Sequence, residues 1–320
     1  MATTPERRDY TPELDYREME RSVDLSEIQH ADDEELLTLN MGPHHPATHG
    51  VLRLLTTLEG EVVRDIKPII GYVHTGIEKN CEDKAYWKVI TLVERMDYLS
   101  YYFNAYAFCG AVERLLDLEI PPRAQYLRVI HLELNRIASH LIWLATGGLD
   151  LGAMSVFWYG WRDRDQILDL FEMSSGQRMH TRYFQVGGVV EDIPSGFGDA
   201  VRDFTREFPT RLDQFEDLID KNEIVLQRLR NVAIVDEETL LGLGVTGPLL
   251  RAAGNPWDLR KAQPYSSYED FEFQIPVGFE RKLRAFCKQM PERVDQTRAL
   301  LAKNEIALQR LRGVAAVDEE

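Results

Sequence analysis

Residues 121–148 read PPRAQYLRVIHLELNRIASHLIWLATGG, and this stretch decides the fold. Two prolines open it, which suits the first turn of a helix, and two glycines close it. Between them, apolar residues recur at spacings of three and four, at Leu127, Ile130, Leu134, Ile137, Ala138 and Leu141. Such spacing gathers the side chains on one face of a helix. The stretch therefore predicts a long helix whose apolar face packs against other helices.

The same periodicity continues on both sides. From about Asp83 to Pro121 it predicts one long helix, whose shared apolar face holds Val89, Leu92, Val93, Met96, Leu99, Phe103 and Ala107. A third helix is expected from about Trp161 to Met173, closed by Ser174-Ser175-Gly176, and a charged helix over about 197–230. These helices together predict a bundle.

Strand-like patterns precede the helices, between Leu37 and Ile70. Residues 51–55 and 62–66 flank Glu59-Gly60, which predicts a hairpin. The expected fold class is therefore α+β, mostly α: a helical bundle core with a small N-terminal antiparallel sheet. Residues 1–36 are acidic and nearly lack aliphatic periodicity, which predicts an arm that is mobile or bound to a partner.

A repeat marks the far end of the chain. Residues 196–238 and 278–320 align without a gap and share more than half of their residues. Two copies are too few for a solenoid, which needs about three repeats to bury its faces. A recent tandem duplication or a gene-model artefact is the favoured interpretation. The predicted organisation is an arm at 1–36, one domain at 37–277 and a duplicated helical segment at 278–320.

Composition narrows the function classes. The formal net charge of the 320 residues is −16, and without a basic stripe to neutralise phosphates, nucleic acid is not an expected partner. Cys81, Cys109 and Cys287 are widely spaced, which argues against a disulfide framework and for a reducing compartment. The polar start predicts no signal peptide, and no apolar run is long enough to span a bilayer. Any role in a membrane process is expected from the water side.

The most unusual segment is Gly42-Pro43-His44-His45-Pro46-Ala47-Thr48-His49-Gly50. Glycine and proline favour an irregular, tightly folded loop, which can hold imidazoles in place for binding or proton exchange. Clustered loop histidines can also be exposed and idle. A metal site is the weaker interpretation, because no cysteine or acidic cluster of ligand spacing lies nearby in the sequence.

This loop opens a longer series of motifs. Together with the following residues 51–54 it resembles the signature of the 49-kDa family of respiratory complex I, also called the D-type family, which is related to nickel-iron hydrogenase large subunits. Further blocks resemble the family in the same order, at residues 71–79, 94–98, 133–141, 149–154, 178–180 and 246–251. The resemblance covers roughly residues 37–278 and implies a hydrogenase-large-subunit-like domain.

The resemblance also implies site residues. His49 and Tyr98 would hydrogen-bond the two carbonyl oxygens of a quinone headgroup. A quinone that receives two electrons must take up two protons, and an imidazole and a phenol are suitable donors. Asp150 would orient His49 and couple to its charge, because a carboxylate stabilises an imidazolium. Quinone reduction could change the interaction between His49 and Asp150 and so trigger proton pumping. This hypothesis predicts that Asp150→Asn alters the number of protons translocated per electron.

Arg95 and His180 resemble the residues beside the terminal 4Fe–4S cluster, which a neighbouring protein of the complex ligates. A cation near such a cluster raises its reduction potential, and a titrating histidine makes the potential depend on pH. Each residue also has a local alternative. Arg95 could pair with a neighbouring carboxylate, Tyr98 could belong to the core, and Asp150 could cap a helix.

The implied function is that of the quinone-binding subunit of a proton-translocating NADH:quinone oxidoreductase, inactive alone. Quinone is the substrate, while NADH, FMN and the 4Fe–4S cluster bind partner subunits. Expected partners are the small iron-sulfur subunit, the 30-kDa-type subunit and the membrane-arm subunit of the quinone cavity. The expected location is peripheral, on the cytoplasmic side of a cell inner membrane or the matrix side in mitochondria.

Three rival functions are weighed against this one. A hydrogenase would need two C-x-x-C pairs for its metals, and a free-standing NADH dehydrogenase would need a G-x-G-x-x-G turn; the sequence has neither. A non-catalytic assembly subunit remains open. Nothing after Gly278 resembles the family's C-terminal segment, and Thr75 stands where many relatives carry arginine, so an arginine contact there does not transfer.

Overall fold

The computed structural model describes residues 36–229, 232, 234–273, 275 and 277. The predicted arm and the second repeat copy lie outside these residues, apart from Leu36. The chain divides into two compact units, and the boundary falls between His74 and Thr75. The expectation that residues 37–277 form one domain stays a prediction.

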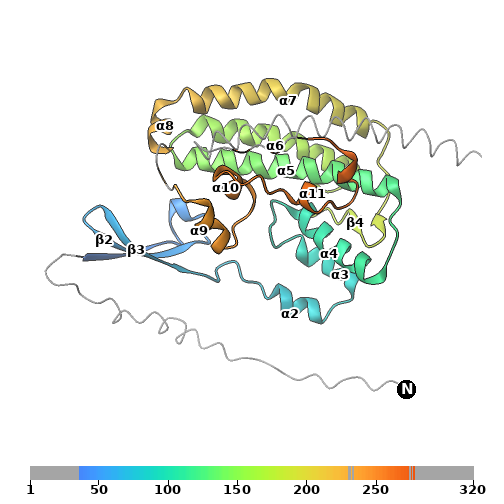
Figure 1. Cartoon of the computed structure of the whole chain (residues 1–320), viewed down its shortest axis with the longest axis horizontal. Coiled ribbons are helices and arrows are strands. Elements are labelled where there is room, and N and C mark those ends of the chain that lie inside the picture. Colours follow the sequence, from blue (N-terminus) through green and yellow to red (C-terminus); the bar gives the residue numbers. More distant parts are fainter. Residues whose placement is uncertain (1–35, 230–231, 233, 274, 276, 278–320) are drawn as a thin grey trace, which may run out of the picture. The chain divides into compact units, whose positions relative to one another are not determined.

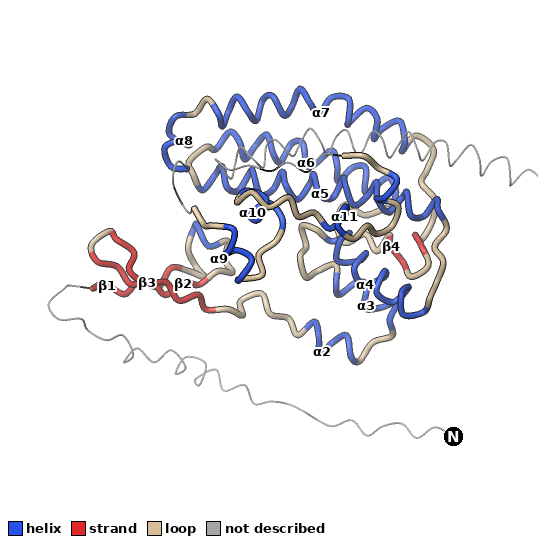
Figure 2. The backbone as a smooth tube through the Cα atoms, in the orientation of Figure 1, coloured by secondary structure: helices blue, strands red, loops and turns tan. Residues whose placement is uncertain are grey.

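Unit 1 is the predicted small sheet. Strands β1 (Leu36–Met41), β2 (Arg53–Glu59) and β3 (Val62–Ile69) pair antiparallel in that order (Figures 1 and 2). Glu59 pairs with Val62 at the hairpin, and Gly60 in its turn has a φ of 57°, a conformation that glycine adopts without strain. The hairpin prediction is confirmed.

Unit 2 is helical, as predicted. Three long helices, α5 (Pro122–Asp150), α6 (Met154–Ser175) and α7 (Phe197–Asp220), pack side by side with α6 in the middle (Figures 1 and 2), and α4 (Tyr101–Leu116) packs beside α5. The shorter elements are α2 (Ile77–Glu82), α3 (Tyr86–Val93), β4 (Phe184–Gln185), β5 (Gly188–Val189), α8 (Glu223–Leu229), α9 (Glu237–Gly242), α10 (Gly247–Ala252), α11 (Leu259–Ala262) and the 3-10 turn η3 (Tyr268–Asp270). The α+β, mostly α class is confirmed.

Helix α5 forms the centre of unit 2, and polar groups within it are fully buried. His131 has no exposed surface, and its ring stacks on Phe197 at a centroid distance of 5.4 Å. Its Nδ1 lies 2.8 Å from the carbonyl oxygen of Leu127, and its Nε2 lies 2.9 Å from the hydroxyl of Ser174. Burial lowers the pKa of His131 to about 4, so the ring is neutral near neutral pH.

A second buried group ties the C-terminal part of unit 2 to α5. Glu133, with no exposed surface, accepts hydrogen bonds from the hydroxyl of Tyr268 at 2.5 Å and from Arg260 at 3.4 Å. Arg260 also pairs with Asp258 at 2.5 Å. Because these charges neutralise one another inside the protein, they hold residues 258–268 against α5.

Four helix boundaries differ from the sequence prediction. The helix expected from about Trp161 begins seven residues earlier, as α6 at Met154. The long helix expected from Asp83 to Pro121 is wrong: α3 ends at Val93, and α4 begins only at Tyr101. Helix α5 continues through the glycine pair to Asp150. At Gly148 the helix passes close to Val156, since a Cβ there would lie 2.8 Å from the Cβ of Val156. The charged helix breaks between α7 and α8, where the side chain of Asn222 accepts the N–H of Ile224 at 3.1 Å.

The close approach of α5 and α6 depends on a second glycine. A Cβ at Gly160 would lie 2.8 Å from the Cβ of Ala145 and 3.0 Å from the carbonyl oxygen of Leu141. We expect Gly160→Ala to destabilise the protein by about 1–3 kcal/mol, because the two helices must separate. Gly110→Ala in α4 is the matched control, because its Cβ would meet only Tyr106 at 3.8 Å. That change is expected to stabilise by about 0.5–1 kcal/mol.

Urea unfolding of the two variants measures this difference. Equal effects of the two substitutions would show that α5 and α6 tolerate a methyl group at their contact.

Candidate functional site

The histidine loop of unit 1 folds around one buried threonine. Thr48 is 2% exposed, and its hydroxyl donates to the carbonyl oxygens of Pro43 at 3.1 Å and His45 at 3.0 Å. Gly42 has a φ of 85°, and a Cβ there would lie 2.0 Å from the carbonyl oxygen of Leu52. Only glycine fits at this position, so the tight loop expected from Gly and Pro is present.

Two histidines of this loop differ in their surroundings. His45 caps the 3-10 turn η2 (Pro46–Thr48), and its Nδ1 accepts the N–H of Ala47 at 3.1 Å. His49 follows the turn with a φ of 53° and is exposed. His45 therefore has a structural task, while the loop presents His49 at the surface of unit 1.

In unit 2, residues 94–100 form the break between α3 and α4. The side chain of Asp97 accepts the N–H of Leu99 at 3.2 Å. Its carbonyl oxygen accepts the N–H of Ser100 at 3.0 Å and the side-chain amide of Asn104 at 2.8 Å. These local bonds compete with helical ones and fold the segment as turns.

Helix α5 holds this break in place through two polar side chains. The amide group of Asn135 donates to the carbonyl oxygen of Leu99 at 3.0 Å, and its oxygen accepts the N–H of Tyr102 at 3.2 Å. The hydroxyl of Ser100 donates to that of Ser139 at 3.2 Å. The motif at 133–141 thus supplies the contacts that fix the segment carrying Arg95 and Tyr98.

Arg95 and Tyr98 are both exposed on this segment. Tyr98 retains 47% of its accessible surface, so the alternative that it belongs to the core is wrong. Arg95 donates to the backbone carbonyl of Thr91 rather than to a neighbouring carboxylate. Both side chains therefore extend from a rigidly held turn toward the surface, where another molecule can reach them.

The loop that follows α6 brings His180 to the same segment. The hydroxyl of Tyr101 donates to the carbonyl oxygen of Arg178 at 2.9 Å. His180 has a φ of 53°, and its Nδ1 lies 3.2 Å from the carbonyl oxygen of Glu94. Burial and the positive charge of Arg95 lower the pKa of His180. The structure thus brings Arg95 and His180 together, and their place beside a cluster stays a prediction.

Asp150 lies elsewhere in unit 2. It is the last residue of α5, exposed, and about 16 Å farther along the helix than Ser139. Leu151 is the C-cap of α5 and Ala153 is the N-cap of α6, so the alternative that Asp150 caps a helix is wrong. His49 belongs to the other unit, and its pairing with Tyr98 or Asp150 stays a prediction.

Two residues of this region were missed from the sequence. Glu94 and Asn135 lie within the motifs at 94–98 and 133–141, and the sequence predicts no role for either. Glu94 follows Ile90 by four positions, which places its side chain on the same helical face as a fully buried residue. That spacing was the available signal. The sequence holds no such signal for Asn135. Its partners are backbone groups in the break between α3 and α4, which the apolar periodicity did not predict.

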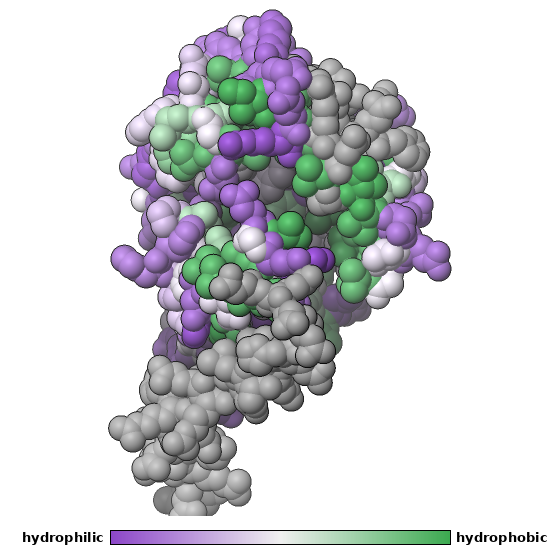
Figure 3. Space-filling view, turned by 90° about the vertical axis from the view of Figure 1, so that its left-hand side faces the viewer, coloured by the Kyte–Doolittle hydropathy of each residue, from purple (hydrophilic) through white to green (hydrophobic). Residues whose placement is uncertain are grey.

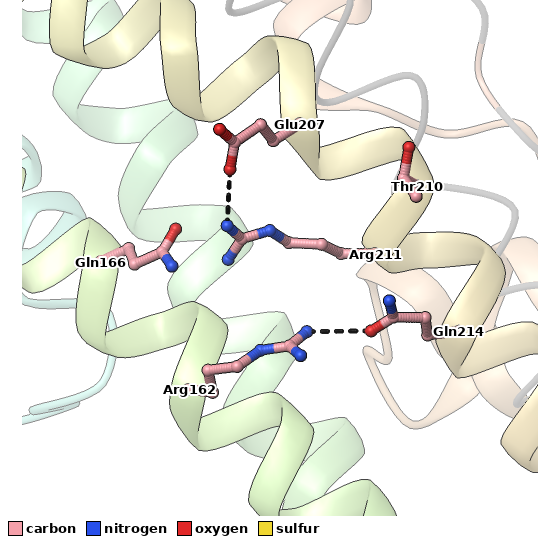
Figure 4. A pocket seen from close by; sticks show the side chains of 6 residues that line it. All are labelled: Arg162, Gln166, Glu207, Thr210, Arg211 and Gln214. Carbon is pink, nitrogen blue, oxygen red and sulfur yellow. Dashed lines mark hydrogen bonds and ion pairs between the residues drawn. The ribbon is translucent and has the colours of Figure 1, made fainter.

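An open cavity of about 390 Å³ lies between α6 and α7, away from these residues. Figure 4 shows its lining side chains, Arg162, Gln166, Glu207, Thr210, Arg211 and Gln214. Arg211 pairs with Glu207 at 2.7 Å, and both arginines bond the fully buried Asp163, at 2.7 Å from Arg162 and 2.9 Å from Arg211. The charges lining the cavity are thus engaged in joining the two helices.

The exposed surface mixes polar and apolar areas, as the green and purple patches of Figure 3 show on one face. The exposed residues of α5 and α6 include the large apolar side chains of Trp143, Met154, Trp158 and Trp161. No helix in the described part of the chain is long and apolar enough to cross a membrane. Within the same residues, no cluster of three or more His, Cys, Asp or Glu could hold a metal ion.

Comparison with known proteins identifies the class. The family model of the respiratory-chain NADH dehydrogenase 49 Kd subunit matches residues 150–281 and 274–320. The chain is 53% identical over 244 residues to the second NADH-quinone oxidoreductase D subunit of Chloroflexus aurantiacus, covering 76% of this chain and 59% of that protein. It is 47% identical over 278 residues to the D subunit of Acidothermus cellulolyticus, covering 86% and 62%. The first D subunit of Solibacter usitatus is 48% identical over 275 residues, covering 86% and 67%.

These proteins are subunits of NADH-quinone oxidoreductases. The chain belongs to their 49-kDa family. It spans about three fifths of the length of the first of these relatives. The resemblance seen in its motifs is therefore confirmed at the level of the family. Its expected end near residue 278 is wrong, because the family model also matches residues 274–320.

Proposed function

We propose that this chain is the quinone-binding subunit of a proton-translocating NADH:quinone oxidoreductase. The observation that carries the proposal is the single turn at 94–98, which presents Arg95 and Tyr98 at the surface with His180 beside Arg95. Arg95 suits a position beside an electron donor, and Tyr98 suits hydrogen bonding to a quinone. The two residues lie three positions apart in the sequence. Electron entry and substrate binding are thereby close, which short-range electron transfer requires.

In this proposal Tyr98 and His49 hydrogen-bond the two carbonyl oxygens of the quinone. The quinone takes up two electrons and two protons and leaves as the quinol, and both side chains can donate a proton. Asp150 stabilises the charged form of His49. The backbone that carries Tyr98 is held by the bonds of Asp97 and Asn135, which favours a preorganised position for its hydroxyl.

The electron donor is a 4Fe–4S cluster that the small partner subunit ligates, and it supplies one electron at a time. Among the described residues, Arg95 and His180 suit a position beside such a cluster, whereas the buried Cys109 does not suit its ligation. Burial raises the pKa of the Cys109 thiol to about 12, which disfavours the thiolate that iron binding needs. Arg95 offers instead N–H donors and a positive charge for the cluster's sulfur atoms, with His180 beside it.

The proposed assembly places the flavin and NADH in other subunits. The partners are the small iron-sulfur subunit, the 30-kDa-type subunit and the membrane-arm subunit of the quinone cavity. In this assembly the chain lies at the membrane surface, on the cytoplasmic side or on the mitochondrial matrix side. A second candidate function is a non-catalytic assembly subunit of the same complex, which the repeat copy beyond residue 278 favours.

The test supplies this chain to membranes that lack their own copy of the protein. We expect inhibitor-sensitive NADH:quinone reduction, and a loss of about tenfold or more in His49→Ala. His44→Ala is the matched control, because His44 is exposed in the same loop and is expected to leave the rate unchanged. Electron entry at the flavin is assayed separately with an artificial acceptor. Normal flavin activity without any quinone reduction would favour the assembly role.

A further inference from the structure

Arg164 places a permanent positive charge on the core face of α6. Only 6% of its surface is exposed. It follows Gly160 by four positions and precedes Ile167 by three, and both of those residues are buried. Spacings of three and four bring these positions to one face of the helix. Because a guanidinium keeps its charge at any physiological pH, the helix carries a buried cation there.

The pairing of Arg164 differs from that of the other buried arginines. Three arginines of the described residues are as deeply buried, and each is paired with a carboxylate: Arg128 with Glu113 at 2.5 Å, Arg260 with Asp258 at 2.5 Å and Arg251 with Asp258 at 3.9 Å. Within the same part of the chain, the hydrogen bonding of Arg164 is limited to the sulfur of Met179, at 3.6 Å from its Nη2. A thioether is a weak acceptor without charge, so this guanidinium is buried without a counter-charge among the described residues.

The surroundings of Arg164 do not replace the missing carboxylate. The ring of Trp161, which is 45% exposed, lies 5.7 Å from the guanidinium carbon. Asp165 is the next residue in the sequence, but its carboxylate bonds Arg178. Burial lowers the pKa of Arg164, and the positive charge of Arg178 acts in the same direction. An added anion would therefore relieve an unfavourable charge.

Arg164 also adjoins the region that carries Arg95 and His180. Its contact residue Met179 directly precedes His180 in the loop after α6. The proposed function places the small partner subunit over Arg95 and His180. The surface available to that subunit thus continues through Met179 to Trp161 and Arg164.

We propose that Arg164 is a docking site for one carboxylate side chain of the small partner subunit, which binds the guanidinium beside Trp161 and Met179. This inference rests on the proposed function, because that function supplies the partner. The two oxygens of an aspartate or glutamate match the paired N–H donors of a guanidinium. Its apolar stem suits an aromatic ring and a thioether. Binding neutralises the buried charge at a contact from which the partner excludes water.

Two measurements on Arg164→Met separate binding from a structural role. In the free full-length chain we expect an unchanged or raised urea midpoint, because the substitution removes a charge that has no counter-charge there. Association with the small subunit, measured by isothermal titration calorimetry, should weaken by at least about thirtyfold, since the partner's carboxylate is then buried and unpaired. Arg164→Lys keeps the charge without the paired donors and should recover part of the affinity. Arg206→Met is the control, because Arg206 is 70% exposed on α7, and it should leave the affinity unchanged.

A double-mutant cycle identifies the carboxylate. Each aspartate and glutamate of the small subunit is changed to asparagine or glutamine, alone and together with Arg164→Met. One of these changes should weaken association with the unaltered chain by a similar factor. In the Arg164→Met background the same change should cause little further loss, because the two groups act as a pair.

The outcomes separate this inference from the function beneath it. Association that Arg164→Met leaves unchanged, or a cycle in which no carboxylate couples to Arg164, would overturn the contact and keep the proposed function. A clearly lowered urea midpoint of the free Arg164→Met chain would show that this chain neutralises Arg164 itself, and would also overturn the inference. No association of the unaltered chain with the small subunit would overturn the partner in the proposed function, and the docking site with it.

Discussion

Tyr98→Phe is expected to lower quinone reduction by at least about a hundredfold. The substitution removes one hydroxyl group, which in the proposed function donates to a quinone oxygen and supplies a proton. The ring is 47% exposed at a turn that is held by backbone and α5 contacts, so its loss of one oxygen should leave the fold intact. Quinone reduction and flavin-level activity, measured on the same membranes, give the ratio that reports the effect.

Tyr86→Phe supplies the matched control. Tyr86 is 66% exposed at the start of α3 in the same unit, and its ring stacks on Phe108 at 6.3 Å, a contact that phenylalanine retains. We expect no change in either activity. Quinone reduction that survives in Tyr98→Phe would remove the phenol from the mechanism and leave His49 as the only proposed donor to the headgroup.

Glu113→Gln is expected to reduce the free energy of unfolding by about 3–5 kcal/mol. Arg128 is 2% exposed and forms a two-pronged ion pair with Glu113, at 2.9 and 2.5 Å. Its other hydrogen bonds go to the carbonyl oxygens of Gln185 and Gly188, which carry no net charge. The glutamine variant therefore leaves a guanidinium buried without a counter-charge.

Thermal or urea unfolding measures this loss, and Glu172→Gln is the comparison. Glu172 is 54% exposed at a distance of 3.5 Å from Arg178, so its loss should cost less than about 1 kcal/mol. Similar effects of the two substitutions would show that water reaches Arg128. Since Glu113 also accepts the N–H of Gly187 at 2.8 Å, the β4–β5 hairpin should be the first part to lose protection against hydrogen exchange.

The sequence predicted the elements whose packing is periodic. The stripe from Leu127 to Leu141 lies in the core as expected, and Gly60 sits in the predicted hairpin turn. Periodicity failed where long-range polar contacts override it. Val93 and Met96 fit one helical face, but Asn135 binds the backbone of residues 99 and 102 and stabilises a break instead. A pattern of apolar spacing holds no information about such a partner.

The candidate site was predicted through motifs rather than through physical patterns. Arg95 and His180 are 85 positions apart in sequence, and only the family resemblance brought them together before the structure did. Arg164 shows the limit of that approach. Its importance depends on burial and on the lack of a carboxylate partner among the described residues, and both are properties of the folded chain.

The amide of Asn135 has a consequence for how this protein can be altered. Because one side chain of α5 fixes the backbone at Leu99 and Tyr102, the placement of Tyr98 depends on a scaffold helix as well as on the local bonds of Asp97. Amino-acid substitutions at surface positions of α3 can therefore accumulate without displacing Tyr98. An engineer who wants to admit a bulkier headgroup should redesign the α5 anchor, and not the turn that it holds.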